Sequence, residues 1–129
     1  GHLPERDGVL SSLYFLDMMV KLGRSPSELL GYLYDKVGPH HYRRRDLEFE
    51  AGRQSEIRAL VEKAQPNYLA NRKVIGIDAV DGTRFLLEGG AWGVVRFSGT
   101  EPLIRVYAEA KSVSEAEAIL EAIQVLAKL

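Results

Sequence analysis

Hydroxyl, glycine and arginine residues gather in one short stretch near the C-terminal end of the chain. Residues 96–102 read Arg-Phe-Ser-Gly-Thr-Glu-Pro, and Arg105 follows three residues later. Ser98 and Thr100 carry hydroxyl donors, and Gly99 lets the backbone take a positive φ that turns N–H groups toward an anion. An arginine fork can donate two parallel hydrogen bonds to phosphate oxygens. Together these residue types predict a phosphate-binding loop.

The two arginines that flank the loop are the strongest part of this signal. If the segments before and after the loop pair as strands, Arg96 and Arg105 reach toward the same anion. Two guanidiniums held together without a counter-charge repel each other. Glu101 could supply that charge in a structural ion pair, and Ser-Gly-Thr alone more simply forms a turn that caps strand ends. The paired arginines favour phosphate binding over both structural interpretations.

The periodicity of apolar residues predicts the elements that position the loop. Helices are expected at residues 9–22, 26–37 and 54–64 and from the capping box of Ser112 and Glu115 onward, and strands at residues 42–50, 74–80, 83–87, 92–97 and 103–110. Turn signals at Asp81-Gly82 and Gly89-Gly90 indicate hairpins. The predicted fold class is α+β: a mainly antiparallel sheet of about four strands with helices packed on one face, preceded by two helices.

The first predicted helix, residues 9–22, has an unusual profile. Its polar residues are Ser11, Ser12, Asp17 and Lys21, and most of the others are large and apolar. A helix that is apolar on nearly every side is usually buried. We therefore expect its packing partners to lie outside these residues and the chain to be a fragment, with self-association through this helix as an alternative.

Composition places the chain among ordinary globular proteins and limits its partners. It has 129 residues, a formal net charge of −1 and no cysteine. No global field attracts nucleic acid or an anionic membrane, and no thiolate nucleophile or cysteine-ligated metal is available. No stretch reaches the ~20 apolar residues of a membrane span. We expect a cytoplasmic protein without nucleic-acid or membrane partners.

A second candidate signal is the basic run at residues 40–45, His-His-Tyr-Arg-Arg-Arg. It could be a basic patch for a phosphorylated ligand or nucleic acid. A solvated strand edge is the favoured interpretation, because Asp46, Glu48 and Glu50 follow at once. The adjacent histidines lack a third ligand at metal spacing. No Ser/His/Asp arrangement is apparent either, so neither a metal site nor a catalytic residue is assigned.

The loop and its neighbours resemble a known family. Residues 96–107, Arg-Phe-Ser-Gly-Thr-Glu-Pro-Leu-Ile-Arg-Val-Tyr, resemble the phosphate-binding loop of the α-D-phosphohexomutases, which include phosphoglucomutase and phosphomannomutase. Phe97 stands where that family commonly has proline. Residues 81–85 and 92–94 resemble the hairpin that leads into the loop, and residues 1–10 resemble the end of the third of four domains.

The resemblance implies a domain division and a set of binding residues. Residues 1–38 would be the end of domain 3 and a hinge helix, and residues 39–129 would be the phosphate-binding domain 4, with a fold like that of the TATA-box-binding protein. The non-reacting phosphate of a hexose phosphate would be bound by Arg96, Ser98, Gly99, Thr100 and Arg105.

The resemblance also implies an activity for the complete protein. It would be an isomerase that interconverts hexose 1-phosphate and hexose 6-phosphate through a phosphoserine and a 1,6-bisphosphate, with Mg²⁺ and glucose 1,6-bisphosphate as cofactors. Domains 1–3, in cis, would supply the phosphoserine and the metal, so the fragment alone is expected to bind phosphate weakly and to be inactive. Residues 2–8 resemble the glucose and mannose enzymes more than the glucosamine-phosphate enzymes. The alternative is a non-catalytic module that binds a phosphorylated ligand or nucleic acid.

Overall fold

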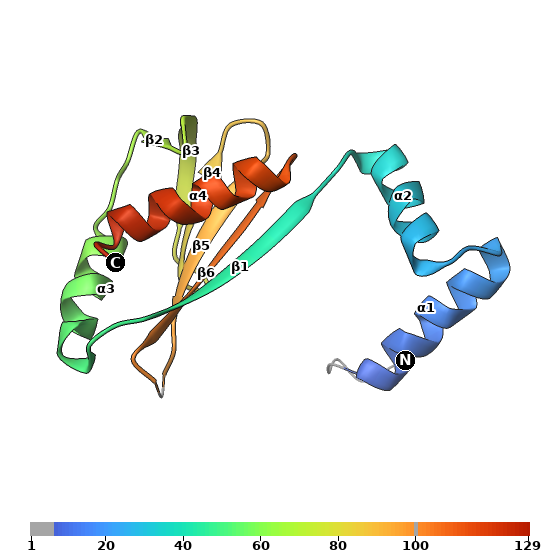
Figure 1. Ribbon diagram of the computed structural model, residues 1–129, viewed down its shortest axis with the longest axis horizontal. Helices are drawn as coiled ribbons and strands as arrows, with labels where there is room; N and C mark the ends of the chain where they lie inside the picture. Colours follow the sequence, from blue (N-terminus) through green and yellow to red (C-terminus); the bar gives the residue numbers. More distant parts are fainter. Residues whose placement is uncertain (1–6, 100) are drawn as a thin grey trace. The chain divides into compact units, whose positions relative to one another are not determined.

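The computed structural model describes residues 7–99 and 101–129, apart from the side chain of Ala51. The chain divides into two compact units, Gly1–Gly38 and Pro39–Leu129. The described part of the first unit contains helices α1 and α2, and the second contains a sheet with its helices (Figure 1).

The first unit is a pair of helices with strong end signals. Helix α1 (Gly8–Leu22) begins where the Asp7 carboxylate accepts a hydrogen bond from the Leu10 N–H at 2.9 Å, and it ends at Gly23 with φ 60°. Helix α2 (Pro26–Val37) begins where the Ser25 N–H donates to the Glu28 carboxylate at 2.8 Å. Both predicted helices are confirmed, because caps and a first-turn proline fix their bounds.

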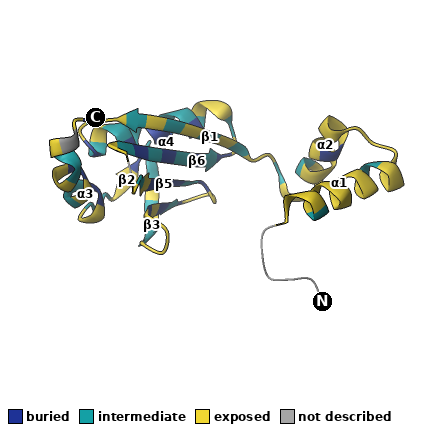
Figure 2. Cartoon of the chain, turned by 90° about the horizontal axis from the view of Figure 1, so that it is seen from below, coloured by how far each residue is buried: buried dark blue, intermediate teal, exposed yellow. Residues whose placement is uncertain are grey.

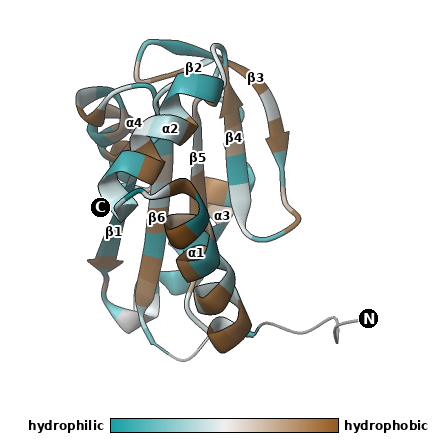
Figure 3. Cartoon of the chain, turned by 90° about the vertical axis from the view of Figure 1, so that its right-hand side faces the viewer, coloured by the Kyte–Doolittle hydropathy of each residue, from teal (hydrophilic) through white to brown (hydrophobic). Residues whose placement is uncertain are grey.

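Helix α1 keeps its apolar side chains in solvent. None of its residues is buried, and its exposed apolar residues are Val9, Leu13, Tyr14, Phe15, Leu16, Met18, Val20 and Leu22. Figure 3 shows hydrophobic colour along much of this helix. Helix α1 therefore has the predicted apolar profile, but it lacks the burial that normally goes with such a profile. Among the described residues, no helix has the length and apolar content needed to cross a bilayer.

The second unit contains a six-stranded sheet in the order β1-β6-β5-β4-β3-β2. Every neighbouring pair is antiparallel. The strands are β1 (His41–Glu48), β2 (Tyr68–Leu69), β3 (Arg72–Asp78), β4 (Thr83–Leu87), β5 (Trp92–Phe97) and β6 (Leu103–Ala110). A short 3₁₀ turn, η1 (Ala51–Arg53), and helices α3 (Gln54–Glu62) and α4 (Val113–Leu126) complete the unit. The predicted α+β class is confirmed, with six strands in the sheet rather than about four.

One face of the sheet forms the core with α3 and α4. The helices contribute Ile57, Val61, Ala116, Ile119, Leu120 and Ile123, and the strands contribute Phe85, Leu87, Val95, Ile104, Val106, Ala108 and Ala110. Figure 2 shows the alternation of buried and more exposed residues along β6. Gly93 lets α4 lie close to β5, because a Cβ there would come within 2.6 Å of Ile123 Cδ1. Packing of this kind holds the ends of β5 and β6, and hence the loop between them, in place.

The start of α4 differs from the predicted capping box. Ser112 Oγ accepts a hydrogen bond from the Glu115 N–H at 3.2 Å, which is one half of that motif. The Glu115 carboxylate instead pairs with Arg72 Nε on β3 at 2.6 Å. A reciprocal bond to Ser112 is lost because a cation from the sheet lies within reach of the glutamate.

Candidate functional site

The face of the sheet opposite α3 and α4 carries polar, charged and aromatic side chains. We call it the open face. Its residues from β1, β5 and β6 are Tyr42, Arg44, Asp46, Glu48, Trp92, Val94, Arg96, Leu103, Arg105, Tyr107 and Glu109. Strand alternation places them there, because successive side chains point to opposite faces and the intervening residues face the core. The open face therefore presents chemistry that the core face lacks.

The two arginines of the predicted site lie side by side on the open face. Arg96 on β5 is the direct partner of Arg105 on β6 in the antiparallel register. Opposed residues of such a pair have Cβ atoms about 5 Å apart, so both guanidiniums project from one spot. Like charges placed directly opposite each other destabilise a sheet. The repulsion between the two guanidiniums must therefore be compensated, either by a bound anion or by nearby carboxylates.

The loop between these strands is closed by its own hydrogen bonds. The Ser98 N–H donates to the Leu103 carbonyl at 2.9 Å, and the Glu101 N–H donates to Ser98 Oγ at 3.3 Å. Thr100 lies outside the described residues. The loop thus brings Ser98 and Gly99 to the same end of β5 and β6 as the arginine pair.

Gly99 departs from the conformation expected of it. The glycines with positive φ are Gly23, Gly38, Gly82, Gly89 and Gly90, and Gly99 is not among them. Apart from Gly99 and its two chain neighbours, no described atom lies within 4 Å of the position that a Cβ at Gly99 would occupy. The absence of a side chain there leaves open space at the loop surface, whereas the expected left-handed backbone is not found.

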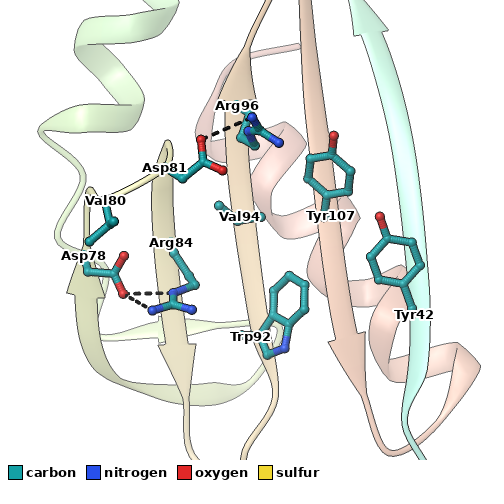
Figure 4. Close-up of a pocket in the computed structure, with 9 residues that line it drawn as sticks. All are labelled: Tyr42, Asp78, Val80, Asp81, Arg84, Trp92, Val94, Arg96 and Tyr107. Atoms are coloured by element: carbon teal, nitrogen blue, oxygen red, sulfur yellow. Dashed lines mark hydrogen bonds and ion pairs between the residues drawn. The ribbon is translucent and has the colours of Figure 1, made fainter. Parts of the chain in front are cut away.

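Carboxylates from two other elements balance the arginines. Arg96 Nη2 lies 3.2 Å from Asp81 Oδ1, which comes from the turn between β3 and β4. Arg105 Nε lies 4.0 Å from Asp46 Oδ2 on β1. Figure 4 shows the Arg96–Asp81 pair beside a second pair, Arg84 with Asp78. The structural interpretation therefore finds its counter-charges in Asp81 and Asp46 rather than in Glu101.

Asp46 is shared between two arginines of the open face. Arg44 donates two hydrogen bonds to its carboxylate, at 2.7 and 2.6 Å. These bonds, with a smaller contribution from Arg105, hold the pKa of Asp46 below its usual value. Arg105 Nε itself is buried and makes no hydrogen bond within the described residues. Asp46 Oδ2, 4.0 Å away, balances its charge but is too far for a hydrogen bond, so an anion at closer range would supply the acceptor that this donor lacks.

A shallow pocket of about 390 Å³ lies on the open face and includes Arg96 in its lining. Tyr42, Trp92 and Tyr107 come from three neighbouring strands and line it (Figure 4). The rings of Tyr42 and Tyr107 have centroids 6.1 Å apart, and partial burial raises the pKa of the Tyr42 phenol. The pocket therefore places three aromatic side chains next to Arg96 on the open face.

The three arginines of the basic run do not form one patch. Arg43 and Arg45 pair with Glu117 on α4 at 3.3 and 2.9 Å, whereas Arg44 pairs with Asp46 on the open face. Strand alternation divides them between the faces. β1 is an edge strand that pairs with β6 alone, as the strand-edge interpretation requires. Across the described ranges, no three His, Asp or Glu residues gather as a metal site.

Comparison with known proteins identifies the family. Residues 49–124 match the family described as "Phosphoglucomutase/phosphomannomutase, C-terminal domain". The chain is 36% identical over 118 residues to a phosphoglucomutase/phosphomannomutase of Thermococcus kodakarensis, covering 90% of this chain and 23% of that protein. It is 33% identical over 116 residues to a phosphoglucosamine mutase of Methanocaldococcus jannaschii, covering 89% of this chain and 24% of that protein.

These matches extend over most of the chain but little of the relatives. The chain spans about a quarter of the length of the curated relatives it matches, and those relatives are named as mutases of either the glucose and mannose type or the glucosamine type. The matched range contains the loop, β5 and β6. This chain belongs to the phosphoglucomutase/phosphomannomutase family and carries that family's C-terminal domain.

Proposed function

We propose that the loop between β5 and β6, with the arginines beside it on the open face, binds the phosphate group of a hexose phosphate within a phosphohexomutase. The observation that carries this proposal is the direct opposition of Arg96 and Arg105 beside the loop of Ser98 and Gly99. A phosphate dianion bridging both guanidiniums would relieve their repulsion and could accept a bond from the buried Arg105 Nε. Thr100 would complete the set as a hydroxyl donor.

The complete protein would be an isomerase that works through a phosphoserine and a hexose 1,6-bisphosphate. The loop would hold the phosphate that is not reacting, so that its binding energy orients the sugar far from the bond being made. After transfer the bisphosphate would reorient, and the loop would hold the other phosphate. Arginine forks suit this alternation because they recognise the phosphate rather than the sugar hydroxyls.

The phosphoserine and the Mg²⁺ would come from domains 1–3 of the same polypeptide. The carboxylates near the loop, Asp46 and Asp81, are each paired with arginine and do not form a metal-ligand group. The glucose-over-glucosamine preference stays a prediction, since relatives of both kinds match.

Calorimetric titration of the 129-residue chain with inorganic phosphate tests the proposal. Arg105→Ala should weaken binding by about tenfold or more, because a hydrogen bond to a charged group contributes about 1.5–3 kcal/mol. Arg84→Ala is the matched control: Arg84 lies on the same face but pairs with Asp78 at 2.6 Å. Equal affinities of the two variants would contradict the proposal, as would mutase turnover by the chain alone.

A non-catalytic nucleic-acid module is the competing hypothesis. Its basic run is already engaged with Glu117 and Asp46, which reduces the charge it offers. Nucleic-acid affinity that falls steeply with salt would favour it. We expect no such dependence.

A further inference from the structure

Two carboxylates lie beside the arginine pair that would bind a phosphate. Asp81 Oδ1 lies 3.2 Å from Arg96 Nη2, and Asp46 Oδ2 lies 4.0 Å from Arg105 Nε. Both are acceptors of the same class as a phosphate oxygen, and both meet the arginines that the phosphate needs. Any anion that binds there therefore competes with groups of the protein itself.

The charges at this end of the sheet are nearly balanced without a ligand. Arg44, Arg96 and Arg105 contribute three positive charges. The carboxylates of Asp46 and Asp81, with those of Glu48 at the end of β1 and Glu101 in the loop, contribute four negative charges. Attraction for a phosphate therefore comes from the local arginine forks rather than from an excess of positive charge, while the carboxylates limit how tightly the phosphate is held. Without the carboxylates, the arginines would repel one another across β1, β5 and β6.

The backbone places Asp81 for this role. Asp81 precedes Gly82, whose φ is 86°. A Cβ at Gly82 would clash with the Val95 carbonyl oxygen and would lie 2.9 Å from Arg96 Cγ. The turn therefore lies directly against the part of β5 that carries Arg96, and glycine permits that approach.

The two carboxylates differ in how firmly they are held. Asp81 is 73% exposed and makes one contact with Arg96, so solvent and an incoming anion can displace it readily. Asp46 is 36% exposed and is fixed by two bonds from Arg44. Arg44 in turn lies over the Tyr107 ring, 5.8 Å from its centroid.

We propose that Asp81 and Asp46 are positioning residues that compete with phosphate for Arg96 and Arg105 and so hasten its release. This inference rests on the proposed function, in which the loop must release one phosphate before it holds the other. Tight binding to two uncompensated guanidiniums would oppose that exchange. The carboxylates keep the arginines stabilised when the phosphate has left.

Phosphate titration of neutral variants of the 129-residue chain, at one fixed low ionic strength, tests the inference. Asp81→Asn should tighten phosphate binding by about two- to fivefold, the range expected when one exposed ion pair is removed. Asp46→Asn should tighten it by about three- to tenfold, because Arg44 is released as well. The dissociation rate should fall by a similar factor in each variant.

The controls separate competition from a general change of charge or fold. Asp78→Asn removes a carboxylate that pairs with Arg84 on the same sheet and should change affinity by less than about twofold. Asp81→Glu should restore affinity close to that of the unmodified chain, because it returns the competing carboxylate. Asp46→Asn should also lower the melting temperature in the absence of phosphate and recover it when phosphate is added.

Three outcomes distinguish the inference from the function on which it rests. Tighter binding in both Asn variants, reversed by Asp81→Glu, supports it. Phosphate binding that is lost in Arg105→Ala but unchanged in Asp81→Asn and Asp46→Asn overturns the inference and leaves the proposed function standing. Absence of phosphate binding by the unmodified chain overturns both.

Discussion

The two faces of the six-stranded sheet carry opposite kinds of side chain, although they are built from the same strands. Along β6, Ile104 and Val106 are fully buried under the helices. Arg105 and Tyr107, which alternate with them in sequence, point to the open face. One face gains its free energy by removing apolar area from water. The other face keeps charges accessible at a cost that its ion pairs offset. The comparison separates residues that stabilise the domain from residues that can bind a ligand.

Adjacent residues of β4 give the largest expected contrast between the faces. Phe85 is fully buried, and Phe85→Ala should lower the free energy of unfolding by about 3–5 kcal/mol because it leaves a cavity. Arg84→Ala, one residue earlier on the open face, should cost about 1 kcal/mol or less. Chemical denaturation of both variants checks this. Similar losses would show that the open face is also a packed surface.

Two glycines of β5 and its loop should respond differently to an added methyl group. Gly93→Ala should destabilise the domain by about 1–3 kcal/mol, because the new Cβ would come within 2.6 Å of Ile123 on α4. Gly99→Ala should leave stability nearly unchanged, since the space around it is open and its φ is not positive. Thermal unfolding compares them. A large loss at Gly99 would contradict the conformation described for the loop.

A conservative change on the open face should alter binding without altering stability. Arg105→Lys keeps the positive charge but removes the planar fork, so phosphate affinity should fall by about three- to tenfold. The melting temperature should stay within about 2 °C of that of the unmodified chain. Titration calorimetry and thermal unfolding measure the two effects. Unchanged affinity would mean that charge alone, rather than bidentate geometry, attracts the anion.

The smallest expected effect is a pH dependence at Asp46. Hydrogen bonds from Arg44 lower the folded-state pKa of Asp46 below its unfolded value of about 3.9. Its contribution to stability is therefore present above that pH and is lost as the pH falls through the lower, folded-state value. The unmodified chain should lose more stability than Asp46→Asn on acidification below about pH 4. If the free energy of unfolding fell equally with pH in both proteins, the lowered pKa of Asp46 would be contradicted.

The sequence predicts most of the sheet because its apolar pattern alternates clearly. β4, β5 and β6 have the predicted bounds, and the turns at Gly82 and Gly89-Gly90 have positive φ. The two-residue strand β2 is missed because its turn has Ala70 and Asn71 at φ 49° and 62°, where glycine would have signalled a hairpin.

The candidate site is predicted in part, for a physical reason. Local sequence indicates the loop and its flanking arginines, and strand pairing brings Arg96 opposite Arg105. Asp46 and Asp81 are missed as their counter-charges because each reaches the site from another strand or turn. Asp81-Gly82 is recognised as a turn, but its ionic partner depends on β4 lying next to β5. Contacts between distant segments leave no periodic signal in the sequence.

The most direct test of the phosphate assignment is a ¹⁵N–¹H NMR titration of the 129-residue chain with inorganic phosphate and then glucose 6-phosphate. We predict that the amides of residues 96–99, 101 and 103–105 shift, that the amides of α4 do not, and that Arg96→Ala removes the shifts. No shift at tens of millimolar phosphate would contradict the account. Shifts centred on residues 43–45, or shifts that persist in Arg96→Ala, would also contradict it.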